Sequence, residues 1–257
     1  MRLDKFLAQS SVGMRKKVRI YINEGMVKVN GAVTTDHARL INESSDVIEF
    51  LGKVVVYTGK KYYMFNKPAG CVTARKDTEN KTVFDYFADE NMNGVFHVGR
   101  LDKDTEGLLL FTNDGEFEHK LMDPQNHIEK TYFFWALGSL DKEDSEKLQQ
   151  GILIGKGKIQ TKASKIEVQK NGLYKDFEHE IDIENFYNID SQYYNQPAVS
   201  GYLTISEGRN HQVKRMLKAV GCYVLYLKRV SIGEIKLDES LERGQYRHLA
   251  LSEAFSP

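Results

Sequence analysis

The chain has no long apolar run, few cysteines and no excess charge of either sign, and each absence narrows its function. No stretch of the 257 residues approaches the roughly 18 apolar residues that a membrane-spanning helix needs. Arg2 and Asp4 stand where a signal peptide would become apolar. The two cysteines, Cys71 and Cys222, lie far apart without C-x-x-C spacing, which favours neither a zinc site nor a disulfide framework. We therefore expect a cytoplasmic protein.

The net charge of zero hides an uneven distribution. Residues 1–61 contain 11 Lys and Arg against 6 Asp and Glu, a charge of +5, so the rest of the neutral chain carries −5. A basic segment on a mildly acidic body indicates local contact with a polyanion such as RNA.

The first 59 residues have the pattern of a small separate domain. Apolar residues recur at i, i+3 and i+4 from Leu3, and a second, basic helical pattern starts at Arg15 and ends at Gly25. Asn30-Gly31 between alternating valines predicts a two-residue hairpin. The glycine- and lysine-containing stretch 52–61 is the best linker candidate, so we expect domains at 1–59 and 60–257.

This order of two helices and a hairpin resembles the small RNA-binding domain of the ribosomal protein S-four family. Arg15, Lys16 and Arg19 would form a ridge that engages phosphates without reading bases. The alternative is an ordinary solvated helix face.

Three alternating carboxylates, Asp102, Asp104 and Glu106, directly precede a run of four apolar residues that ends at Asn113-Asp114. Such a run predicts a short inner strand closed by a turn. The carboxylate spacing also fits an EF-hand calcium loop, but Asn113 stands where the bidentate Glu belongs, and a strand pattern precedes the loop. We expect no metal at this position.

The sequence Gly-Arg-Leu-Asp at 99–102, followed by Asp-Thr-Glu-Gly-Leu-Leu at 104–109, resembles the active-site motif of the RsuA-type pseudouridine synthases, which modify ribosomal RNA. The resemblance implies that Asp102 is the catalytic residue. Arg100 would fill the base stack after the target uridine leaves it, or it forms a salt bridge to Asp104 or Glu106. In the turn 66–70, Lys67 is either a phosphate contact or an ordinary turn lysine.

Two further motifs follow in the family's order. Lys-x-Tyr opens the aromatic strand pattern 130–137, and the resemblance implies that Tyr132 stacks on the target base, although such aromatic residues are commonly core. The sequence predicts a helix from Arg209 to Val220, stopped by Gly221. The run 207–216 resembles the motif that supplies a cation to the catalytic aspartate, which maps to Lys214, with Arg215 as second choice. Leu227 would line the uracil pocket, and Arg209 would contact RNA.

The alternative for His211 in the same run is a role as a metal ligand, but no second His or Cys lies at zinc spacing. Conversion of uridine to pseudouridine oxidises nothing, so no cofactor is expected. A carboxylate in an apolar pocket needs a nearby cation to stay ionised, which is the physical reason to place Lys214 beside Asp102.

These observations together predict an α+β protein: a small RNA-binding domain with two helices and a hairpin, and a catalytic domain with a mixed, mainly antiparallel sheet. The predicted function is pseudouridine formation in ribosomal RNA, with 16S RNA favoured, by a monomer acting on RNA or a pre-ribosomal particle. The alternatives are a 23S RNA synthase and a non-catalytic ribosome-assembly factor. The segment 170–200 has no functional assignment, and a solvated hairpin is the default.

Overall fold

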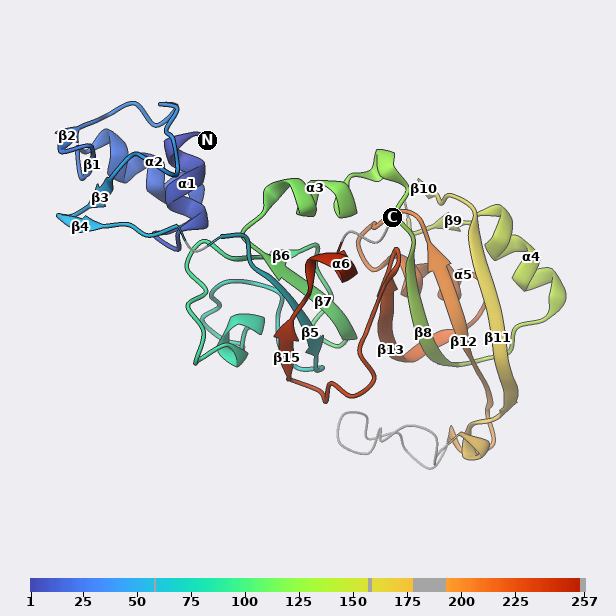
Figure 1. The fold of residues 1–257 in the computed structure, drawn as a ribbon. Coiled ribbons are helices and arrows are strands. Elements are labelled where there is room, and N and C mark those ends of the chain that lie inside the picture. Colours follow the sequence, from blue (N-terminus) through green and yellow to red (C-terminus); the bar gives the residue numbers. More distant parts are fainter. Residues whose placement is uncertain (58, 157–158, 178–192, 255–257) are drawn as a thin grey trace.

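The computed structural model describes residues 1–57, 59–156, 159–177 and 193–254 (Figure 1). The expected hairpin within 170–200 therefore falls largely outside the described residues. Among the described residues, no helix is long and apolar enough to cross a bilayer.

The N-terminal part packs two helices against a four-stranded sheet with the order β2-β1-β3-β4. Its elements are α1 (Leu3–Gln9), α2 (Arg15–Asn23), β1 (Val27–Val29), β2 (Ala32–Val33), β3 (Ile48–Phe50) and β4 (Lys53–Val54). Asn30 and Gly31 both have positive φ, 52° and 78°, as the tight hairpin turn between β1 and β2 requires. The two helices and the hairpin were predicted correctly, whereas β3 and β4 carry no sequence signal strong enough to predict them.

The core of this part is formed by the predicted apolar stripe. Leu3, Phe6 and Leu7 of α1 are buried against Val18 and Ile22 of α2. The next strand of the chain, β5, begins at Tyr62, so the expected boundary at 59/60 lies in the connection after β4.

The rest of the chain is built on one large sheet, whose main order is β11-β12-β8-β13-β7-β5-β15, with β14 on β13 and β6 on β7. Its strands are β5 (Tyr62–Lys67), β6 (Phe96–Val98), β7 (Glu106–Thr112), β8 (Lys130–Leu137), β11 (Ser164–Leu173), β12 (Pro197–Ile205), β13 (Tyr223–Ile232), β14 (Ile235–Lys236) and β15 (Tyr246–His248). A separate pair is formed by β9 (Leu153–Ile154) and β10 (Ile159–Gln160). The helices are α3 (Gly115–Met122), α4 (Lys142–Gln150), α5 (Gln212–Ala219) and α6 (Leu251–Ala254), with 3-10 turns at Val83–Tyr86, Pro124–Asn126 and Tyr174–Asp176.

Strand β7 lies near the centre of this sheet and is buried on both faces. Leu108 and Leu110 pack toward α3, and Leu109 and Phe111 pack into an aromatic cluster on the opposite face. Burial of both faces explains the unbroken apolar run that marked this strand in the sequence.

The pairing of β7 with β13 is parallel, while the other paired strands of the sheet are antiparallel. The expected mixed, mainly antiparallel sheet is therefore confirmed. At Gly107, with φ of 96°, an added Cβ would lie 2.3 Å from the carbonyl oxygen of Arg229. Only glycine lets the start of β7 approach β13 so closely.

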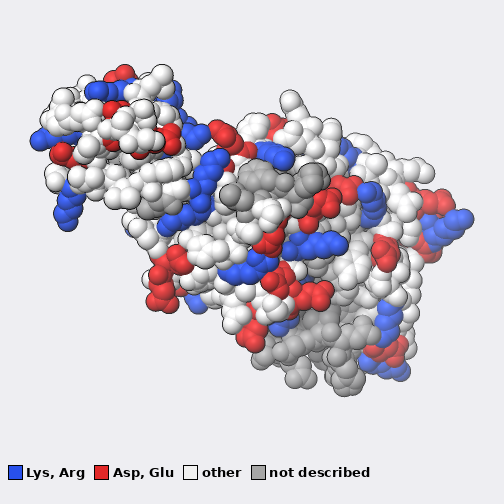
Figure 2. Space-filling view, viewed as in Figure 1, with Lys and Arg blue, Asp and Glu red and all other residues white. Residues whose placement is uncertain are grey.

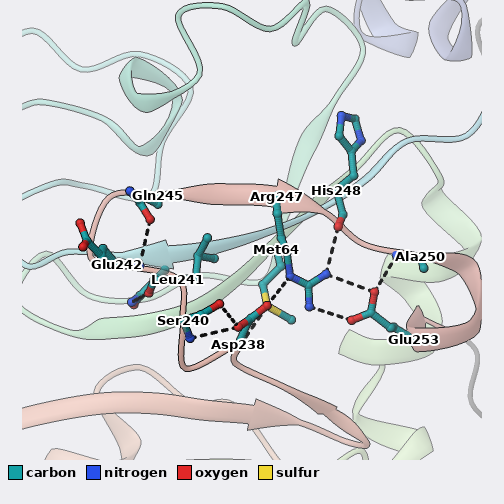
Figure 3. A network of polar contacts seen from close by, with 11 residues as sticks. Met64, Asp238, Ser240, Leu241, Glu242, Gln245, Arg247, His248, Ala250 and Glu253 are labelled. Atoms are coloured by element: carbon teal, nitrogen blue, oxygen red, sulfur yellow. Dashed lines mark hydrogen bonds and ion pairs between the residues drawn. The ribbon is translucent and has the colours of Figure 1, made fainter.

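The C-terminal segment is tied to β5 by a network around Arg247 of β15 (Figure 3). Its guanidinium donates to Asp238 at 2.7 Å and to both oxygens of Glu253 at 2.7 and 3.1 Å. Asn66 at the end of β5 donates to the Leu241 carbonyl at 2.7 Å. These contacts hold β15 against β5, at the edge of the sheet opposite to β11.

The N-terminal part contacts the turn after β7. Lys5 pairs with Glu116 at 2.7 Å, Lys60 with Asp114 at 2.7 Å, and the Asn113 amide donates to a carbonyl of α1 at 3.1 Å. In Figure 2, Lys and Arg side chains gather where this part meets the rest of the molecule. The N-terminal domain thus contacts residues that directly follow β7, the strand after the candidate catalytic turn.

Candidate active site

Asp102 lies in the turn between β6 and β7, at a cleft of about 680 Å³. Segments far apart in the sequence line this cleft, among them 72–74, the turn 99–105, the strands β8 and β13, and the segment 205–214. Among the predicted site residues, the lining includes Arg100, Asp102, Tyr132, Arg209, Lys214 and Leu227. The fold therefore brings together all three sequence motifs.

The backbone on both sides of Asp102 is held by side chains, half-buried Thr73 before it and buried Lys67 after it. Before it, the Thr73 hydroxyl donates to the Leu101 carbonyl at 2.7 Å and accepts from the Leu101 N–H at 3.2 Å. After it, the Lys67 ammonium donates to the carbonyls of Thr105 at 2.9 Å and Lys103 at 3.3 Å. Asp102 thus sits on a turn braced from the protein interior.

This placement corrects the expectation for Lys67. Its side chain is completely buried, and burial lowers the pKa of its ammonium. A lysine with its Nζ bonded to backbone carbonyls inside the fold cannot reach an RNA phosphate. In this structure Lys67 therefore supports the turn, and its Nζ is not placed to contact RNA.

Two cationic or potentially cationic groups approach the Asp102 carboxylate. His211 Nδ1 lies 3.4 Å and Lys214 Nζ 3.6 Å from Oδ2, and the carboxylate side chain remains 31% exposed. Lys214 makes its shorter contact, 2.5 Å, with Asp104. The Lys214 ammonium therefore contacts both the Asp102 and the Asp104 carboxylates. The contact of His211 with Asp102 was not predicted from the sequence motif.

Arg215, the second choice for this pairing, lies elsewhere. Its guanidinium donates to the carbonyls of Asn210 at 3.2 Å and Ile154 of β9 at 3.4 Å. Helix α5 begins at Gln212 and not at the expected Arg209, because residues 209–211 form a turn with His211 at φ of 49°. This turn sets Lys214, rather than its neighbour, toward Asp102.

Buried Glu207 fixes the same turn. Its carboxylate accepts from the Gln212 amide at 2.7 Å, from the Lys162 N–H at 3.0 Å and from Arg209 Nε at 3.0 Å. Arg209 keeps a side chain that is partly exposed at the cleft, and its RNA contact stays a prediction.

Asp104 and Glu106, the predicted salt-bridge partners of Arg100, are bound by other side chains. Asp104 receives Lys214, while buried Glu106 accepts from Arg243 at 2.9 Å and from the Tyr226 hydroxyl at 2.8 Å. Glu106 therefore does not join Asp102 and Asp104 in one carboxylate site. Arg100 itself is exposed at the cleft.

The floor of the cleft comes from adjacent strands β8 and β13. Tyr132 lies directly opposite Arg229, and Leu227 lies opposite Phe134; Tyr132 is half-buried and Leu227 buried. Arg229 and Lys130, which also line the cleft, were not among the predicted site residues. Lys130 is the lysine of the Lys-x-Tyr motif at the start of β8, and Arg229 follows Lys228 in a mostly apolar strand.

The expected basic ridge of α2 is tied to Asp4, a completely buried carboxylate of α1. Arg15 contacts it at 2.9 Å, Arg19 at 2.8 Å and Arg2 at 3.2 Å. Burial alone would raise the pKa of Asp4, but the guanidinium hydrogen bonds outweigh it and hold the pKa well below the usual range. Arg15 and Arg19 stay 47% and 43% exposed, and Lys16 is exposed.

Comparison with known proteins agrees with this architecture. The family described as RNA pseudouridylate synthase matches residues 61–219, and the S4 domain family matches residues 1–48. An uncharacterized RNA pseudouridine synthase of Bacillus subtilis is 39% identical, with 98% of this chain and 96% of the relative covered. Ribosomal small subunit pseudouridine synthase A of Haemophilus influenzae is 36% identical, with 98% and 97% covered.

A ribosomal large subunit pseudouridine synthase B of Bacillus subtilis is also 36% identical, with 96% of this chain and 91% of the relative covered. Among solved structures, a pseudouridylate synthase crystal structure matches with a TM-score of 0.63 and 34% identity, with 99% and 98% of the two chains covered. The chain therefore belongs to the RNA pseudouridylate synthase family and carries an S4 domain. The resemblance to RsuA-type enzymes is confirmed.

Proposed function

We propose that the enzyme isomerises a specific uridine in 16S ribosomal RNA, with Asp102 as the catalytic carboxylate. The assignment to the small subunit is supported by full-length relatives that are ribosomal small subunit pseudouridine synthases A. The observation that carries the catalytic assignment is the Asp102 carboxylate at the cleft, with Lys214 and His211 at 3.6 and 3.4 Å.

The reaction breaks the bond between uracil N1 and ribose C1′ and forms one between C5 and C1′. The Asp102 carboxylate acts on the sugar, either as the nucleophile at C1′ or as the base that removes the C2′ proton. The C5 proton is lost and N1 gains a proton, so the atoms balance without a cofactor. Lys214 places a positive charge beside this carboxylate, and Tyr132 would stack on the base.

The target uridine must leave its base stack to reach the cleft. Arg100, exposed beside Asp102, is placed to fill the vacated stack, because a guanidinium plane stacks on bases. Phosphates would be held by Arg209 at the cleft and by Arg15, Lys16 and Arg19 of the N-terminal domain. The proposed ribosomal substrate would place the enzyme in the cytoplasm.

A large-subunit target is the second candidate, favoured by the large-subunit relative of Bacillus subtilis. The two are separated by incubating the enzyme with 16S and 23S transcripts and mapping pseudouridine in each. Asp102→Asn should abolish pseudouridine formation while changing RNA affinity little, and Asp144→Asn on the remote helix α4 is the matched control. Turnover by Asp102→Asn would contradict the catalytic assignment, and modification of 23S RNA alone would contradict the 16S assignment.

A further inference from the structure

The floor of the cleft holds two buried cations that the proposed mechanism does not use. Arg229 of β13 is 3% exposed and Lys130 of β8 is 6% exposed, and both line the same cleft as Asp102. Buried charges are ordinarily paired with an opposite charge or a ligand. These two are close enough to each other that the charge of Arg229 adds to burial in lowering the pKa of Lys130, to about 8.

Their contacts in the protein are to backbone carbonyls. Lys130 Nζ donates to the carbonyls of Ile128 at 2.8 Å and Leu121 at 3.1 Å. Arg229 Nε donates to the Leu108 carbonyl at 2.8 Å. Among the described residues, no ion pair to a carboxylate is formed by either side chain, and the buried Arg229 Nη2 has no hydrogen-bond partner. The floor is therefore positively charged and holds an unused donor.

We propose that Arg229 is a catalytic residue whose Nη2 donates to a carbonyl oxygen of the flipped uracil and, with Lys130, stabilises the detached uracil as an anion. The inference rests on the proposed function, since it needs a uridine in this cleft. Preorganised donors aimed at developing negative charge are the most effective form of electrostatic catalysis.

The chemistry requires such a group whichever way Asp102 acts. When the N1–C1′ bond breaks, its electron pair stays on the base, so uracil becomes an anion with charge shared by its ring nitrogen and carbonyl oxygens. The base must then turn to present C5 to C1′. Uracil has a pseudo-twofold axis through N3 and C6, which exchanges N1 with C5 and O2 with O4. A donor fixed in the floor therefore meets a carbonyl oxygen both before and after this turn.

The position of Arg229 favours the base over an RNA phosphate as its ligand. Arg229 lies in a central strand directly opposite Tyr132, the residue expected to stack on the base. Phosphates belong to a continuous strand that enters and leaves the cleft, and partly exposed Arg209 is available to them at the cleft. The edge of a flat base reaches a buried floor more easily than a backbone phosphate does.

The test measures single-turnover pseudouridine formation at saturating RNA, on a mixture of 16S and 23S transcripts. Arg229→Met should lower the rate about 100- to 1,000-fold, the loss typical for removal of one such donor. Arg229→Lys, which keeps the charge, should recover part of the rate, and Arg229→Gln, which loses the charge, should stay at least about 10-fold slow. Arg247→Met is the control, because Arg247 lies at the far edge of the sheet in a separate polar network.

Affinity for RNA is measured in the Asp102→Asn background, where adding Arg229→Met should change it less than about threefold. A wild-type rate for Arg229→Met would overturn the proposal; if that variant does not fold, a wild-type rate for Arg229→Gln would do so. Weaker RNA binding with a reduced salt dependence and an unchanged saturated rate would instead identify a phosphate contact.

The mixed RNA keeps this proposal separate from the small-subunit assignment. If the wild type modifies only 23S RNA, the 16S assignment fails and the Arg229 variants are compared on 23S RNA. If the wild type modifies neither RNA, both proposals fail together.

Discussion

Replacement of Asp4 by asparagine should separate the structural role of the α2 arginines from their role in RNA binding. Asp4 is completely buried and is contacted by Arg2, Arg15 and Arg19. Removal of one partner from a fully buried ion pair costs about 3 to 5 kcal/mol. Because the arginines remain more than 40% exposed, solvent screening reduces this energetic cost. We expect Asp4→Asn to lower the free energy of unfolding by about 2 kcal/mol.

For a domain of this size, that loss would lower the midpoint of thermal unfolding by about 10 °C. The pKa of Asp4 is held below its ordinary value. Its stabilising effect is therefore complete above about pH 4 and is lost as the pH falls further. Unfolding of the N-terminal domain, followed by hydrogen exchange or urea titration, should accordingly depend less on acid pH in Asp4→Asn than in the wild type.

The loss of stability in Asp4→Asn should not be accompanied by a loss of RNA affinity. Asp4→Asn releases Arg15 and Arg19 from a carboxylate, so RNA binding should stay the same or tighten at a temperature where the domain is folded. Arg15→Ala with Arg19→Ala removes two phosphate contacts and should reduce the slope of log affinity against log salt by about 1.5. Equal weakening of RNA binding by Asp4→Asn and by the double variant would refute this reasoning, because the arginines would then act only through the fold.

Two further predictions concern buried lysines. Lys67→Met removes the brace behind the catalytic turn and should slow single-turnover catalysis about 100-fold with little loss of RNA affinity; an unchanged rate would show that the turn holds its shape without this lysine. The pKa of Lys130, lowered to about 8 by burial and by Arg229, means that the folded protein loses this proton before the unfolded chain does. The free energy of unfolding should therefore rise between pH 8 and 10 relative to Lys130→Met, by at most about 1.4 kcal/mol per pH unit, and parallel urea-titration curves for the two proteins would contradict it.

Much of the architecture was predictable because local pattern and tertiary environment agree. The apolar stripe of α1, the Asn30-Gly31 turn and the doubly buried run of β7 each have one energetically reasonable structure. The three motifs could be placed on a turn, a strand and a helix. The sequence order alone could not show that the turn at 102, the strand at 132 and the helix at 214 meet at one cleft, since this depends on the parallel pairing of β7 with β13.

The errors concern charged residues, whose burial depends on long-range contacts. Lys67 has the sequence context of an exposed turn lysine, yet carbonyls more than thirty residues away accept its hydrogen bonds. Arg229 and Lys130 lie in strands whose sequences are mostly apolar or aromatic, so the local pattern predicts a strand but does not indicate a buried cation. The start of α5 was placed three residues early because the Glu207 contacts that hold the preceding turn have no local pattern.

The bracing of Asp102 by Lys67 and Thr73 has a consequence for substrate choice. If this turn carries the catalytic carboxylate, as proposed, and is already held in place in the free protein, the conformational change needed for recognition falls to the RNA. A uridine that is costly to extract from its surroundings would be ignored even when its sequence context is right. Selection among the many ribosomal uridines would then depend on how easily each local RNA structure opens, and a site would be most accessible while the ribosome is still being assembled.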